Sequence, residues 1–126
     1  MEKLINTKSK EYDLEERIFR FVERLLVFIK KIKKDNINQD IINQLTRAAT
    51  SVGANYFEAN ASSSRKDFRN KIYISKKEIN ETKYWLRVLS VYNDILKEET
   101  MVFWKEAHES HLIFQKITST LDKNKN

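Results

Sequence analysis

Proline is absent from the sequence, and glycine occurs only once in its 126 residues. Sheet proteins need both residue types at their turns, whereas helix interiors disfavour both. Hydrophobic residues make up 40% of the chain and charged residues 33%, a balance typical of a helical globular protein. The length suits one domain with one core. We therefore predict an all-α fold, in a single domain over residues 1–126.

Apolar residues recur at three- and four-residue spacing, which places them on one face of a helix. The pattern predicts four helices, at about residues 13–34, 38–60, 65–92 and 98–121. The breaks between them are only a few residues long, so consecutive helices should run antiparallel. The predicted architecture is an antiparallel, up-down-up-down four-helix bundle.

Polar residues that can cap a helix stand at the start of three of these stretches. Their side chains accept hydrogen bonds from the free N–H groups of the first turn. Gly53, inside the second stretch, is expected to mark a close approach of another helix or a bend. The charged tail from Asp122 to Asn126 is expected to fray. The predicted caps are Asp13 with Glu16, Asn36 or Asn38, and Ser64 with Asp67.

The sequence also limits where the protein resides and what it binds. It has no cysteine, which excludes disulfides and thiolate metal sites. The polar N-terminus, from Met1 to Tyr12, lacks the apolar core of a signal peptide. The longest apolar run, from Leu25 to Ile29, is too short to span a bilayer. We expect a soluble, cytoplasmic protein that does not contact a membrane.

Few residues suit catalysis or metal binding. There is no Gly-x-Ser-x-Gly elbow, and one glycine cannot build a phosphate cradle. A ferritin-like di-iron site needs two Glu-x-x-His pairs, and the chain has none. His108 and His111 could share one metal ion, but two ligands do not close a site. We predict no metal, no cofactor and no catalytic residue, with His111 in the core or an interface and His108 at the surface.

Lysine and arginine outnumber aspartate and glutamate by 24 to 18, and this excess favours anionic partners. On the third predicted helix, several basic residues fall within about 40° of one another, with no acidic residue between them. This cationic line is either a solvated helix face or a surface that binds nucleic acid. It consists of Arg65, Arg69, Lys76, Lys83 and Arg87.

A second group of basic residues lies at the end of the first predicted helix. Cations there complement the exposed carbonyls of the helix terminus, although the group is also a candidate anion site. The chain lacks the glycine-bearing aromatic platform that stacks single-stranded bases, so any RNA or DNA should be bound through phosphates and shape. The group consists of Lys30, Lys31, Lys33 and Lys34.

The third predicted helix is apolar on two sides. Its main stripe, which includes Ile72, Ile79 and Leu86, is expected to face the core. A second stripe lies well over a quarter-turn away and cannot face the same core. Large apolar side chains left in water forfeit about 1.5–3 kcal/mol each, so we expect an oligomer interface there. This stripe consists of Ile74, Trp85, Val88 and Tyr92.

Polar residues follow one flank of the second predicted helix. Arg47 and Glu58 are about 16 Å apart along the helix axis, so they cannot pair with each other. Each needs a partner on another helix or another subunit. We favour a structural polar network, buried or facing an interface, over an acid–base site. The predicted network consists of Arg47, Ser51, Asn55, Glu58 and Glu81.

Two stretches of the sequence are distinctive. They are Q-L-T-R-A-A-T-S-V-G-A-N-Y-F-E-A, from Gln44 to Ala59, and I-S-K-K-E-I-N-E-T-K-Y-W-L, from Ile74 to Leu86. Both resemble the 23S rRNA intervening-sequence proteins, also called four-helix bundle proteins. The family's typical arginine, serine, asparagine and two glutamates match the five network residues. The chain departs from the family where Gly53 stands for proline, Ala59 for glycine, and Lys77 and Glu78 for a Gly-Ser pair.

The resemblance implies a bundle that assembles into a ring-like pentamer, encoded in some bacteria within insertions of the large ribosomal RNA gene. The fold is also similar to the basic accessory variability protein of diversity-generating retroelements, which binds nucleic acid. Neither relative is an enzyme. We therefore predict a non-catalytic, basic oligomeric scaffold that binds RNA or DNA, or a nucleic-acid-bound protein, by charge. The alternatives are a protein-interaction module whose charge serves solubility and, as a third hypothesis, a cytosolic metalloenzyme.

Overall fold

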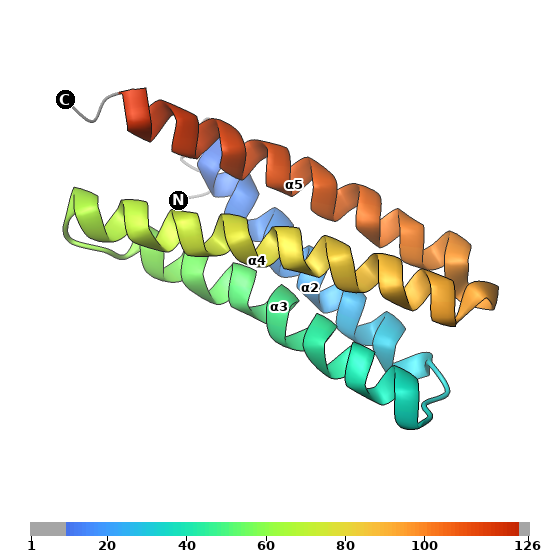
Figure 1. Ribbon diagram of the computed structural model, residues 1–126. Helices are drawn as coiled ribbons and strands as arrows, with labels where there is room; N and C mark the ends of the chain where they lie inside the picture. Colours follow the sequence, from blue (N-terminus) through green and yellow to red (C-terminus); the bar gives the residue numbers. More distant parts are fainter. Residues whose placement is uncertain (1–9, 124–126) are drawn as a thin grey trace.

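A computed structural model of the protein describes residues 10–123. Within this range the chain forms four long helices, a short 3₁₀ helix and no strand. Consecutive long helices run in opposite directions, and α4 lies between α3 and α5 (Figure 1). The predicted all-α fold of four helices is confirmed. The helices are α2 (Lys10–Lys31), α3 (Asn36–Asn60), α4 (Arg65–Tyr92), η1 (Asp94–Leu96) and α5 (Lys97–Lys123).

The bounds of α3, α4 and α5 lie close to the predicted ones, whereas α2 is shifted toward the N-terminus. Asp13 lies inside α2, so its prediction as a cap is wrong. The end of α2 is covered by Lys34, whose Nζ donates to the carbonyls of Ile29 (2.7 Å) and Ile32 (3.0 Å). Residues 1–9 and 124–126 of the predicted domain, including most of the polar N-terminus and the end of the tail, lie outside the described residues.

Two side chains cap the central helices. Asp35, rather than Asn36 or Asn38, is the N-cap of α3, and Asn38 Oδ1 accepts a hydrogen bond from the Asp35 N–H in a capping box. The same Asn38 is fully buried and donates to Asn93 Oδ1 (3.1 Å), which joins the start of α3 to the end of α4. Ser64 caps α4 as predicted and accepts from the Asp67 N–H at 3.0 Å.

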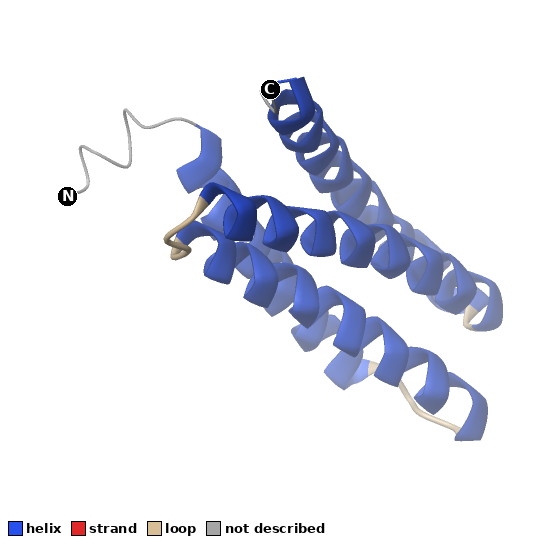
Figure 2. Ribbon diagram, turned by 60° about the vertical axis from the view of Figure 1, so that its left-hand side comes forward, coloured by secondary structure: helices blue, strands red, loops and turns tan. Residues whose placement is uncertain are grey.

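All four helices contribute to one apolar core. Helix α4 supplies a fully buried stripe that includes Ile72, Ile79 and Leu86, as its periodicity predicts. Helices α4 and α5 meet near η1 and lie further apart at the opposite end (Figure 2). None of the helices between residues 10 and 123 has the length and apolar content of a membrane span.

Helix α2 completes the bundle behind α4 (Figure 1). It is tied to α5 by Arg24, which pairs with Glu106 at 2.6 Å, and to α3 through Ile18. Gly53 faces that isoleucine, but a methyl group on Gly53 would lie 3.5 Å from Ile18 Cγ2, an ordinary contact. The glycine is therefore not required by a closer approach of the two backbones.

Candidate nucleic-acid interface

Over its middle turns α4 presents opposite charges to α3 and to α5, whereas nearer its start Lys71 pairs with Glu58 of α3. The flank toward α3 presents Glu78 and Glu81, which reach a single arginine of that helix. The flank toward α5 presents Arg69, Lys76 and Lys83, which meet aromatic and histidine side chains. We call the contact of α4 with α3 at Glu78 and Glu81 the acidic seam. We call the contact of α4 with α5 at Arg69, Lys76 and Lys83 the basic seam.

Arg47 of α3 occupies the acidic seam. Its guanidinium pairs with Glu81 and, at 3.3 Å, with Glu78. Glu81 also accepts a hydrogen bond from Trp85 Nε1 at 3.0 Å, and this bond, with Arg47, holds the pKa of its carboxyl below the usual 4.5. The Glu81 hydrogen bond in turn raises the pKa of Arg47. About half of the Arg47 side chain remains in water, so the network is only partly buried.

The other predicted network residues do not join this group. Asn55 donates to the Ser51 carbonyl (2.9 Å) and hydroxyl (3.1 Å) on its own helix. Glu58 pairs with Lys71 at 2.6 Å, and its side chain is 56% exposed, so it is not buried within its own chain. Glu78, only 8% exposed, was missed because the resemblance marked it only as a departure from the family pattern.

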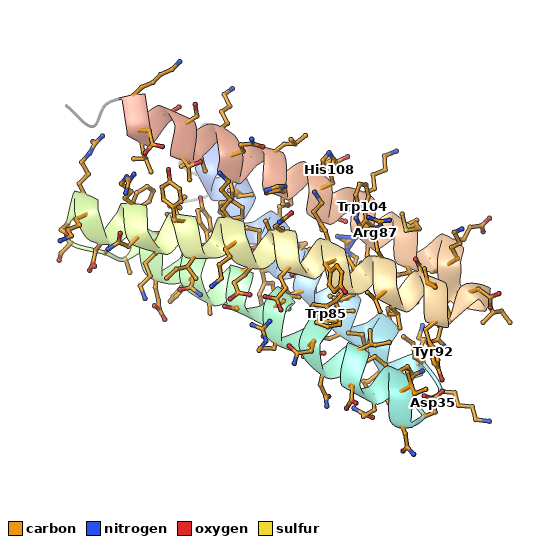
Figure 3. The ribbon with its side chains drawn as sticks, viewed as in Figure 1. Asp35, Trp85, Arg87, Tyr92, Trp104 and His108 are labelled. Atoms are coloured by element: carbon orange, nitrogen blue, oxygen red, sulfur yellow. The ribbon has the colours of Figure 1, made fainter. Side chains whose placement is uncertain are left out.

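The basic seam between α4 and α5 has Lys83 at its centre. Its ammonium lies 2.9 Å from His108 Nδ1 and 3.3 Å from His111 Nδ1. It also lies 5.3 Å from the centre of the Trp104 ring, and that ring stacks on His108 with centroids 5.1 Å apart (Figure 3). Burial lowers the pKa of Lys83. The pKa of His111 is lowered by burial and then by the neighbouring cations.

Toward the end of α5 the basic seam meets an acid. Arg69 pairs with Asp122 at 2.8 Å, and the Tyr73 hydroxyl donates to the other oxygen of that carboxylate at 2.6 Å. The Tyr73 ring also lies beneath Arg69 (4.8 Å) and near Lys76 (5.7 Å). Asp122 therefore belongs to a folded helix and not to a frayed tail, and it interrupts a line that looked free of acids from the sequence of α4 alone.

Most other arginines of the bundle are matched by carboxylates. Arg17 pairs with Glu109, Arg20 with Glu16 at 2.9 Å, and Arg24 with Glu106. In contrast, among residues 10–123 no carboxylate pairs with three cations of the basic seam, which are Lys76, Lys83 and Arg87. Arg87 is exposed.

A family model described as 23S rRNA-intervening sequence protein matches residues 10–119. The chain belongs to this family. A solved structure from Bacteroides thetaiotaomicron, described as a protein of unknown function from the S23 ribosomal protein family, is 30% identical. Its alignment covers 88% of this chain and 99% of the other, with a TM-score of 0.78. No curated protein matches.

The four residues predicted to form an oligomer interface lie in two different environments in this chain. Trp85 and Val88 are half-buried and pack against the core of their own chain, so part of their apolar surface is covered without another subunit. Ile74 is 38% exposed, and Tyr92 is 41% exposed with its hydroxyl on Asp35 Oδ2 at 3.0 Å. The periodicity did not show that α3 covers the side of α4 on which Trp85 lies.

The histidines do not form a metal centre with neighbouring ligands. Among the described residues, no three His, Cys, Asp or Glu side chains are grouped so as to hold a metal ion. His108 and His111 instead face the Lys83 ammonium, a cation. The sequence placed all three residues on the correct helices, but it contained no signal that would bring them together.

The two glutamates predicted for one network should differ in their effect on stability. Glu81→Ala removes the acceptor of Trp85 Nε1 and Arg47 and should lower the free energy of unfolding by about 1–2 kcal/mol. Glu58→Ala breaks an exposed pair and should cost less than about 1 kcal/mol. Urea unfolding of both variants measures the difference.

The pH dependence provides a control. Because the folded chain depresses the pKa of Glu81, the stabilisation by its carboxylate is present above the unfolded pKa and is lost as the pH falls through the folded pKa. The stability gap between the unmodified protein and Glu81→Gln should therefore narrow below pH 4.5. If Glu58→Ala and Glu81→Ala lower the free energy of unfolding equally, the assignment of Glu81, but not Glu58, to the network with Arg47 is contradicted.

Proposed function

We propose that the protein binds nucleic acid through the phosphates of its backbone, at the basic seam. The seam consists of Arg65, Arg69, Lys76, Lys83 and Arg87 of α4 with His108 and His111 of α5. The observation that carries the proposal is the segregation of charge: Arg17, Arg24 and Arg47 are paired with carboxylates, whereas Lys76, Lys83 and Arg87 are not among the described pairs. Unmatched cations gathered along one seam are the electrostatic footprint of a polyanion site.

The chemistry of the seam favours phosphates over bases. Lysine and arginine neutralise phosphates and release bound counterions, which supplies affinity without sequence preference. The Tyr73 and Trp104 rings are occupied by their own cations and by His108, so they are not free platforms for bases.

The proposal includes a cytoplasmic, non-catalytic scaffold without a cofactor. A net charge of +6 per chain is modest, and self-association would multiply it. The resemblance to a ring-like pentamer, and to the basic accessory protein of diversity-generating retroelements, supports an oligomer in which the charges of several chains add up. A bound nucleic acid, or a protein that carries one, is the proposed partner.

A protein-interaction module is the second candidate function. An apolar groove of about 570 Å³ lies between α2 and α3. Its rim carries Phe19 and Phe57, which are 62% and 63% exposed. Large exposed aromatic side chains are typical of protein-binding surfaces. Loss of RNA binding with retained binding of a protein would favour this function.

The charge of the basic seam can be tested against a matched control. Replacing Lys76, Lys83 and Arg87 by Gln should weaken RNA binding and flatten the plot of log affinity against log salt, whose slope is about −0.7 per neutralised phosphate for single strands and about −0.9 for duplex DNA. The control replaces Lys30, Lys31 and Lys33 by Gln, which removes the same charge at the end of α2.

Fluorescence anisotropy over a salt series measures both variants. We expect the control to keep most of the affinity and slope of the unmodified protein. Absence of RNA and DNA binding at low salt contradicts the proposal. A larger effect of the α2 substitutions would instead place the binding surface at the lysine run of α2.

Self-association is proposed with Ile74 at the contact. Ile74 is an exposed apolar member of the predicted stripe, whereas Trp85 packs against the core of its own chain. Light scattering coupled to size exclusion should show an oligomer that Ile74→Glu dissociates while the helical circular dichroism is retained. A monomer at tens of micromolar, or an unchanged Ile74→Glu oligomer, contradicts this contact.

A further inference from the structure

Three nitrogen atoms meet in the basic seam between α4 and α5. His108 and His111 are three positions apart and share one face of α5, and both Nδ1 atoms lie close to Lys83 Nζ, at 2.9 and 3.3 Å. Trp104 lies one turn before His108 and stacks on it. The Trp104 indole N–H is buried and has no hydrogen-bond partner in the described part of the chain. The seam therefore holds a buried donor, the Trp104 N–H, that has no acceptor among the described residues.

The charge state of this cluster depends on what occupies it. An ammonium can only donate, so the contacts to both Nδ1 atoms require neutral imidazoles that accept at Nδ1. Protonation of either histidine would turn that Nδ1 into a donor facing a cation. An anion in the cluster removes the conflict, because the lysine and both imidazolium rings can then donate to its oxygens.

The charges around His111 also make its protonation depend on whether an anion is bound. On the α4 side His111 faces Lys83 and Lys76, and on α5 it faces His108. The acidic residues of α5 that face α2, Glu106 and Glu109, are already paired with arginines. Burial and these cations lower the pKa of His111. A bound anion would offset the repulsion and favour the protonated imidazole.

We propose that Lys83, His108 and His111 form a phosphate site that takes up protons when it binds, so that the basic seam holds a backbone phosphate of RNA more tightly in mild acid. The site rests on the proposed function, since it is one position within the nucleic-acid surface. The protons come from solvent, and no covalent bond changes. His108 and His111 are the only histidines in the sequence, so no other imidazole contributes to the effect.

The first test measures the affinity for a labelled single-stranded RNA at pH 8 and pH 6, at constant ionic strength. One proton taken up throughout this interval would add about tenfold in affinity per pH unit, or about 100-fold in all. An average uptake of about half a proton should therefore increase the affinity of the unmodified protein about tenfold. The His108→Gln, His111→Gln double variant should lose this gain. The α-amino group also titrates near pH 8, but it is common to both proteins. An equal gain in the double variant overturns the proposal.

The second test examines the site without nucleic acid. Proton NMR of the two imidazole rings follows their titration in sodium chloride and in inorganic phosphate at matched ionic strength. Phosphate should raise the pKa of His111 in the unmodified protein, and Lys83→Gln should reduce this effect. A His111 pKa that is the same in both salts overturns the phosphate site.

The two tests separate this inference from the proposed function. If RNA fails to bind at either pH while phosphate raises the His111 pKa, the anion site stands and the nucleic-acid function fails. If RNA binds with the same pH dependence in the double variant, the nucleic-acid function stands and the histidine site fails. Circular dichroism of each variant verifies that the bundle is folded.

Discussion

The burial of one stripe of α4 between α3 and α5 is the constraint on which the rest of the structure depends. Its apolar side chains, such as Ile79 and Leu86, are removed from water completely, and each stabilises the fold by about 1.5–3 kcal/mol. Because that stripe faces the core, the other residues of α4 lie on the flank toward α3, on the flank toward α5 or in solvent. The carboxylates of Glu78 and Glu81 then face α3, and the cations of Lys76 and Lys83 face α5.

The two flanks use their charges differently. Toward α3, carboxylates and Arg47 satisfy one another, and Trp85 adds a donor, so the charges contribute to the specificity of packing. Toward α5, Lys83 is surrounded by neutral or aromatic groups, with neither a carboxylate partner nor full exposure. Burial disfavours the charged form of Lys83 and lowers its pKa, and an anion bound beside it would restore the charged form.

The sequence predicts the helices well because the apolar period and the scarcity of glycine and proline are local signals. It predicts the site less well, since a helical wheel tells which residues share a face but not what the neighbouring helix places opposite. Asp122 and the two histidines come from α5, so the acid beside Arg69 and the imidazoles beside Lys83 could not be inferred from α4. Trp85 was assigned to a subunit contact for the same reason.

Chemical footprinting of lysines tests the central claim, that the α4–α5 seam is where nucleic acid binds. The rate of acetylation of each lysine is followed by mass spectrometry with and without saturating RNA, so that each side chain serves as its own reference. We predict that RNA slows the modification of Lys76 and Lys83, while Lys30 and Lys31 on α2 react at unchanged rates. Protection confined to the α2 lysines, or equal protection of both groups, would contradict it.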